Sequence, residues 1–395
     1  MAPFFLILFL FVYCGGQNFG IKPVVAGKPV AEIMLYNSKV DYPIEKIAFS
    51  EFVDSVRFIK FETTEMCQNI NSVLFINQEI IVLDKVRNNI LVFDNDRKFI
   101  RKIAKRGQKA GEYMNIASCN YDSEGKTLII YDNIGTKLLL YRTTGEFIKE
   151  VSIKKTKGKE IVNIGAIINL PNGNYLCYNN ALYKDLGNYS GLWEIDKDGN
   201  FVRTLLKYDV AVPAIFTLNN PTFQSLTDGT IAIRDAMHHD IYHYNAGEIN
   251  KYISYEIKDS KLIKHQGTPL LNQPILSCIG FHESNNYIIT HWKDETGVFI
   301  FGLYNKSLNK VRFTNTFESS DLNVIWPLER INSNRDNMIF VSLSGTKIMQ
   351  ILKENTVSEQ TRNILSGFIK NMNEDEIKNM MPIIEVLFLK NKSVN

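Results

Sequence analysis

Familiar catalytic and metal-binding signatures are missing from this sequence. It contains no G-x-S-x-G motif, no H-E-x-x-H motif and no Cys/His nucleophile pattern. An excess of charge of one sign is also lacking. The chain has 45 Lys and Arg and 42 Asp and Glu, so its net charge does not indicate a nucleic-acid partner. We therefore expect no nucleic-acid binding and no cofactor, and the motifs alone identify no catalytic residue.

Cysteine is scarce and irregularly spaced. Beyond the N-terminal region the sequence has Cys67, Cys119, Cys177 and Cys278, with no C-x-x-C pair. Such spacing is typical of small apolar side chains buried in strands. A disulfide outside the cytoplasm is an alternative, but the spacing does not indicate one.

Long hydrophobic runs are absent as well. The apolar run from Phe4 to Tyr13 is too short to span a bilayer and indicates a signal peptide. Cys14 follows it directly, as in bacterial lipoproteins, where that cysteine is lipidated. Tyr13 stands where a small residue is usual, and no Lys or Arg precedes the run, so ordinary secretion or a plain anchor are the alternatives. We predict a signal over 1–14, a linker over 15–45 and a membrane partner through the lipid.

A repeat of strand-forming segments dominates the rest of the chain. The segments "ILVFDNDRKF" (90–99), "LLLYRTTGEF" (138–147) and "LWEIDKDGNF" (192–201) each join an apolar run to a polar turn and an aromatic residue. The segment "IYHYNAGEI" (241–249) fits with one residue fewer. A period near 50 in strand-rich sequence is the signature of propeller blades.

Each repeat has two more strands upstream, so the unit contains four strands. Five units occupy about residues 70–314. For a sixth blade we expect strands at 337–344 and 383–390, with an amphipathic helical insertion at about 345–380 between them. The early strand 55–63 would complete this blade and remove an open edge. The prediction is an all-β, six-bladed β-propeller of four-stranded blades, forming one domain over 46–395.

The stretch "NNILVFDNDRKFIRKIAKRGQKAGEY" (88–113) resembles the signature of six-bladed propeller proteins abundant in Bacteroidetes and related to NHL-repeat propellers. That family usually reads close to "ILVFDxxGKFIRKIGxxGxGPGEY". Here Arg97 and Ala104 replace glycines, and Ala110 replaces the proline. The resemblance covers about 45–390 and implies the fold and a lipoprotein. It implies no activity and transfers no catalytic residue.

The glycine- and lysine-rich end of that stretch has two interpretations. "KRGQKAGEY" (105–113) suits a phosphate loop in composition, but it lacks a strand–loop–helix context. Gly107 and Gly111 instead suit a crossover between blades, beneath which Tyr113 can pack. We favour the structural joint over the ligand loop.

Loop lengths predict which face binds. Hairpins between first and second strands, and between third and fourth strands, are short, whereas the other connections are long and lie on the opposite face. Any site should therefore surround the channel mouth on the long-loop face. The basic candidates there, with a solvated rim as the alternative, are Lys85, Arg87, Lys105, Arg106 and Lys109.

Histidine and tryptophan supply the remaining candidates on that face. The segment "MHHDIYHY" contains His238, and a strand-spaced histidine pair can bind metal, but no second motif fixes a geometry, so we predict no metal site. Trp292 and Trp326 can stack on a sugar ring, with packing in the core or a crossover as the alternative for each.

Two functions remain open. The first is a membrane-tethered, extracytoplasmic binding or scaffold module for a glycan, peptide or protein. The second is a glycan- or peptide-processing enzyme whose carboxylates meet in the propeller funnel. Two facing carboxylates about 5–10 Å apart would favour the enzyme, and a funnel without them would favour binding.

Overall fold

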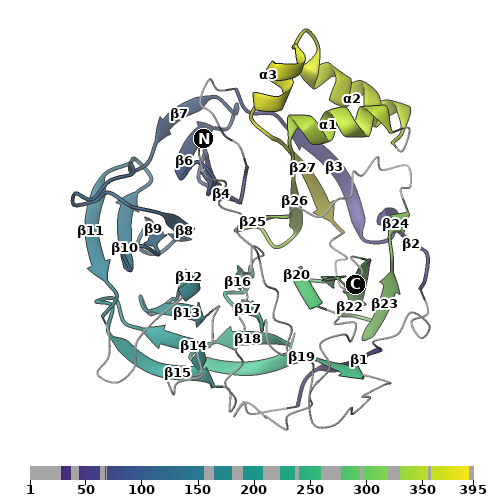
Figure 1. Cartoon of the computed structure of the whole chain (residues 1–395). Coiled ribbons are helices and arrows are strands. Elements are labelled where there is room, and N and C mark those ends of the chain that lie inside the picture. The colour runs from purple at the N-terminus through teal and green to yellow at the C-terminus, as the bar shows by residue number, and fades with distance from the viewer. Residues whose placement is uncertain are drawn as a thin grey trace, which may run out of the picture.

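The computed structural model describes residues 28–36, 44–62, 67, 69–154, 164–179, 190–207, 223–235, 240–258, 277–293, 298–318, 330–354 and 357–390. Within these ranges the strands form a ring of six four-stranded antiparallel blades around a central channel (Figure 1). The repeat in the sequence therefore predicts the architecture correctly. Among the described helices, none is long and apolar enough to cross a membrane.

The first five blades run in chain order from the inner strand to the outer strand. Their second strands are almost entirely buried, whereas the outer strand of blade two is mostly exposed, because blade faces pack on their neighbours and outer edges meet water. Blade one contains β4 (Ser72–Ile76), β5 (Glu79–Asp84), β6 (Asn89–Asp94) and β7 (Phe99–Lys102); blade two contains β8 (Ile116–Asp122), β9 (Thr127–Asp132), β10 (Lys137–Arg142) and β11 (Phe147–Ser152).

The next three blades repeat this pattern. Blade three contains β12 (Ile164–Asn169), β13 (Tyr175–Asn179), β14 (Ser190–Ile195) and β15 (Phe201–Lys207); blade four contains β16 (Phe223–Ser225), β17 (Ile231–Arg234), β18 (Ile241–Asn245) and β19 (Glu248–Lys258); blade five contains β20 (Ser277–Glu283), β21 (Tyr287–Lys293), β22 (Phe299–Asn305) and β23 (Lys310–Thr314).

The sixth blade joins the two ends of the domain. It contains β25 (Arg330–Ser333), β26 (Met338–Leu343), β27 (Ile383–Leu389) and β3 (Val53–Ile59). In the register, Phe340 lies opposite Val386, which in turn lies opposite Arg57. The early strand thus closes the last blade as its outer strand, as the sequence predicts.

The insertion between β26 and β27 is helical, as predicted. It contains α1 (Gly345–Lys353), α2 (Glu359–Ile369) and α3 (Glu374–Asn379), capped at their N-termini by the side chains of Ser344, Ser358 and Asn373. The buried residues Ile348 and Leu365 share one hydrophobic cluster with Leu387 of β27. The helices therefore extend the core of blade six beyond its sheet.

An additional N-terminal segment runs along the outside of three blades. Strand β1 (Ala31–Tyr36) pairs in parallel with β19 of blade four, and β2 (Ile47–Ala48) pairs with β24 (Phe317–Glu318), which follows blade five. A short 3-10 helix, η1 (Phe49–Glu51), then leads to β3 of blade six. The predicted linker thus contains a paired strand, whose apolar residue Ile33 is buried against blade four.

The stretch 105–113 is a joint between blades one and two. Gly111 has φ 77°, and its carbonyl accepts a hydrogen bond from the Tyr141 hydroxyl. Tyr113 is buried beneath the crossover, and its hydroxyl donates to the carbonyl of Asn88. Both glycine-dependent geometry and aromatic packing therefore serve the crossover rather than a phosphate.

The core lies between the blades. For example, Trp193 of blade three packs with Tyr131 of blade two, and Trp292 of blade five packs with Ile253 of blade four. All four described cysteines are buried in such clusters and form no disulfide with one another. Burial raises the pKa of Cys119 to about 12, which makes that thiol unreactive.

Candidate functional site

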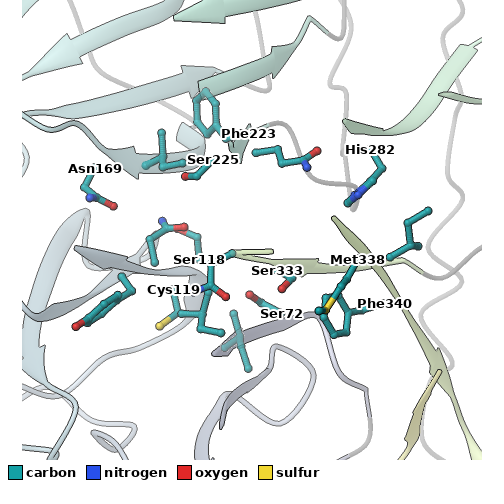
Figure 2. Close-up of a pocket in the computed structure, with 18 of the residues that line it drawn as sticks. Ser72, Ser118, Cys119, Asn169, Phe223, Ser225, His282, Ser333, Met338 and Phe340 are labelled. Carbon is teal, nitrogen blue, oxygen red and sulfur yellow. The ribbon is translucent and has the colours of Figure 1, made fainter. Parts of the chain in front are cut away.

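The central channel contains a cavity of about 100 Å³ lined by all six inner strands (Figure 2). This volume holds several water molecules or a small polar ligand. Propeller geometry creates the site, because each inner strand presents alternate side chains to the common axis. The cavity therefore draws residues from positions as distant in sequence as Ser72 and Phe340.

Hydroxyl and amide groups give the cavity its polar character. They alternate with aromatic and aliphatic walls that include Phe223, Phe281 and Met338. This combination of apolar surface with a few convergent polar groups is typical of small-molecule sites. The polar lining residues are Ser72, Ser118, Asn120, Asn169, Gln224, Ser225, His282, Ser333 and Asn334.

Several of these polar groups form hydrogen bonds between neighbouring blades and are therefore not available to a ligand. The Gln224 amide makes two hydrogen bonds to the backbone of Glu283, joining blades four and five. The Asn334 amide likewise makes two bonds to the backbone of Phe75, joining blades six and one. Paired amides fix the positions of the inner strands, so the cavity is preorganised.

Hydrogen bonds connect three blades at the end of the channel that carries the short hairpins. His282 donates from Nε2 to the carbonyl of Asp336 over 2.8 Å. The Asp336 carboxylate accepts the backbone N–H of Thr227 at 2.7 Å and also its hydroxyl. These contacts connect blades four, five and six at this end of the channel, so we propose that a ligand would enter from the opposite, long-loop end.

Lys85 is the one charged side chain among the described residues that line the cavity. It lies in the turn after β5, where its backbone N–H donates to Oδ1 of Asn71 over 2.8 Å. The buried carboxylate of Asp84 fixes this turn by accepting the N–H groups of Val86 and Arg87. Burial lowers the pKa of the Lys85 ammonium, and no described carboxylate pairs with it. An anion in the cavity would compensate this charge.

A second group in the cavity wall is also uncompensated. Ser118 Oγ is buried and has no hydrogen-bond partner within the described part of the chain. It lies on β8, the inner strand next to the blade that carries Lys85. The cavity thus offers an ammonium and a hydroxyl donor from adjacent blades.

The other predicted basic residues lie outside the cavity. Arg87 and Arg106 are exposed, and their loops touch through the Tyr113–Asn88 bond, so the fold does bring these loops together. Lys109 is exposed, and its backbone N–H donates to Oε2 of Glu112. Lys105 forms an ion pair of 3.2 Å with the same carboxylate. Of the five predicted basic residues, the structure places Lys85 at the cavity and the others at the rim.

Trp292 is a core residue. Its side chain is fully buried in β21, where the ring contacts Tyr255 edge-on at 4.9 Å and Nε1 donates to Oγ1 of Thr290. An indole packed in this way has no free face for a sugar, which agrees with the packing alternative. His238, Trp326 and Cys14 lie outside the described residues, as do long loops at 180–189, 208–222, 259–276 and 319–329.

Sequence reasoning missed the neutral lining residues. Ser118, Asn169 and Ser225 occur in ordinary strand segments, and nothing in the local sequence distinguishes them from other polar strand residues. Among the described residues, no group of three or more His, Cys, Asp or Glu has a geometry that could hold a metal ion.

A known structure shares this architecture. A candidate exported protein from Bacteroides fragilis NCTC 9343 aligns with a TM-score of 0.70 and 15% identity, over 91% of this chain and 100% of that one. A member of the duf4221 family from Bacteroides vulgatus aligns with a TM-score of 0.49 and 9% identity, over 86% and 99%. At these identities the likeness to the first concerns the fold alone, and the second adds no argument.

The sequence itself matches a family over most of its length. No curated protein matches this sequence. The family described as "Domain of unknown function (DUF4934)" matches residues 33–381, which include most of β1, the first five blades, three of the four strands of blade six and the helical insertion. The chain therefore belongs to this family of six-bladed propellers.

Proposed function

We propose that this protein is a binding propeller that holds a small, polar, negatively charged ligand in its central channel. The observation that carries the proposal is Lys85, an ammonium with a lowered pKa at a cavity whose other described lining residues are uncharged or imidazole. An anion beside this group would stabilise its charged form and raise its pKa. An acidic sugar or a peptide carboxylate has the required charge and hydrogen-bonding groups.

The composition of the lining supports binding over catalysis. Hydrolysis of a glycan usually requires two carboxylates, and the described lining contains Ser, Asn, Gln, His and Lys instead. The amide pairs at Gln224 and Asn334 favour a rigid site, which lowers the entropic cost of ligand binding. The enzyme alternative is an outcome of the test below.

Calorimetric titration tests the proposal. Purified protein is titrated with a hexuronic acid, the matching neutral hexose and a short acidic peptide at fixed ionic strength. We expect binding of an acidic ligand, and Lys85→Met should weaken it tenfold or more. Lys109→Met removes the same charge from the exposed rim and should change little. Equal weakening by both variants, or unchanged binding in Lys85→Met, would contradict the site, and release of a product would favour the enzyme.

We further propose that the propeller is tethered outside the cytoplasm through a lipid on Cys14. The support is the apolar run that ends at this cysteine. Strand β1 begins 17 residues after Cys14, on the outer edge of blade four, so a tether would attach to the side of the ring. Attachment there would leave the channel entrance free for a ligand.

A further inference from the structure

A buried guanidinium that has no counter-ion among the described residues lies between blades four and five. Arg234 is the last residue of β17, and its side chain is 0% exposed. Its Nη1 donates to the carbonyl of Cys278 over 2.5 Å, which places the group beside the beginning of β20. Its Nε and Nη2 are buried and have no hydrogen-bond partner within the described part of the chain. A buried charge left in this state is strongly unfavourable, so a partner is expected.

The neighbouring carboxylates of Asp235 and Asp240 contact other groups. The Asp235 side chain faces blade three, where the Tyr178 hydroxyl donates to its Oδ1 over 3.1 Å. Asp240 pairs with Lys251 at 2.6 Å and accepts the backbone N–H of Tyr255 at 3.0 Å. Among the described residues, therefore, no carboxylate neutralises Arg234.

The two unpartnered atoms share one edge of the guanidinium. Nε and Nη2 point their N–H groups in parallel, and this edge matches the two oxygens of a carboxylate in a bidentate contact. Because Asp235 and Asp240 already place negative charge at this end of blade four, a monoanion suits the position better than a dianionic phosphate.

The position of Arg234 fits ligand access from the proposed entrance. Arg234 ends the second strand of its blade, and Cys278 stands near the start of the next inner strand, so both lie toward the long-loop face. Lys85 belongs to blade one, whereas this guanidinium belongs to blade four. The site is thus separate from the channel site described above.

We propose that the Nε–Nη2 edge of Arg234 is a binding site for the carboxylate group of a small ligand. The site does not depend on Lys85 and is independent of the proposed function. It recognises the geometry of two oxygens rather than negative charge alone, so acetate should bind and chloride should not.

Nuclear magnetic resonance of protein labelled with ¹⁵N-arginine tests this directly. The Arg234 Nε–H signal is identified by its loss in Arg234→Lys. Titration with sodium acetate, replacing sodium chloride at constant ionic strength, should shift this signal in a saturable way. The Nε–H of Arg203 is the internal control, because it already donates to Oε2 of Glu194 at 2.7 Å and should not move.

A second measurement keeps the proposal testable if the variant folds poorly. Acetate should raise the unfolding temperature of the wild-type protein above that in equal chloride, and part of this rise should remain in Lys85→Met, which removes only the channel ammonium. In Arg234→Lys, which keeps the charge but loses the edge, acetate affinity should fall at least tenfold. An unresponsive Arg234 signal, or an equal shift with chloride alone, would overturn the proposal.

Discussion

Arg312, on the outer strand of blade five, donates from Nε to Oε2 of Glu45 over 2.6 Å. The same guanidinium donates to the Glu51 carboxylate and to the carbonyl of Lys46. One side chain therefore binds three positions of the N-terminal segment that runs along the propeller wall.

Removing this guanidinium should loosen the N-terminal segment. We expect Arg312→Met to lower the free energy of unfolding by about 1 kcal/mol, because the ion pairs are partly solvated. Chemical denaturation measures the change. The matched control is Lys105→Met, which should have little effect because the Lys105 side chain is 78% exposed in its ion pair with Glu112. Equal losses in the two variants would show that Arg312 does not hold the segment.

The same cluster predicts a pH dependence. Partial burial raises the pKa of Glu51, but hydrogen bonds from Arg312 and the Ala48 N–H outweigh it, so the pKa is lowered overall. A lowered carboxyl pKa stabilises the fold above the unfolded value of about 4.3. This stability is lost as the pH falls through the folded value. Glu51→Gln should flatten the loss of stability below about pH 4.3 in denaturation series, and an unchanged pH profile would contradict the prediction.

Substitutions at one turn position should change the stability of the protein in opposite directions in two blades. The turn before the outer strand has φ 68° at Arg97 in blade one and φ 93° at Gly145 in blade two. A non-glycine residue is strained in this left-handed region. Arg97→Gly should therefore stabilise by about 0.5–1 kcal/mol, and Gly145→Ala should destabilise by about 1 kcal/mol. Thermal unfolding checks both, and destabilisation by Arg97→Gly would show that its side chain contributes more than the strain costs.

A cavity made at β27 in blade six should lower the free energy of unfolding. Leu387 of β27 is fully buried between the sheet of blade six and the helices. Leu387→Ala should cost about 2–5 kcal/mol of unfolding free energy, because the rigid core cannot collapse around the void. Leu308→Ala makes the same chemical change at a residue that is 70% exposed and should cost under about 0.5 kcal/mol. Comparable effects would mean that blade six contributes little to the fold.

Lipidation at Cys14 remains a prediction from the sequence. In cells fed a fatty-acid analogue, the wild-type chain should be labelled because the apolar run ends at this cysteine. Cys14→Ser removes the acceptor thiol and should abolish the label, whereas Cys177→Ser changes a buried thiol and should not. Equal labelling of the Cys14→Ser chain would rule out a lipoprotein.

The fold could be predicted from the sequence because its signals are local. Four-strand repeats near 50 residues apart specify blades, and polar turns with glycine mark the hairpins at Gly145 and Gly199. The helical insertion was accessible because its apolar residues recur with helical spacing. Strand β1 was missed because a single short apolar segment does not reveal its partner, and parallel pairing with β19 depends on a distant sheet edge.

The sequence by itself determined the blades, the closure through β3 and the placement of Lys85 in a turn on the long-loop face. It could do so because strand period and turn chemistry act over a few residues. Tertiary structure alone decided which residues share the channel and which charges lose their partners. Ser118 meets the cavity, Trp292 enters the core and Arg234 is left with two nitrogen atoms that have no partner among the described residues, because the ring of blades sets these positions. Burial and charge compensation depend on neighbours far apart in the chain, and no local pattern records them.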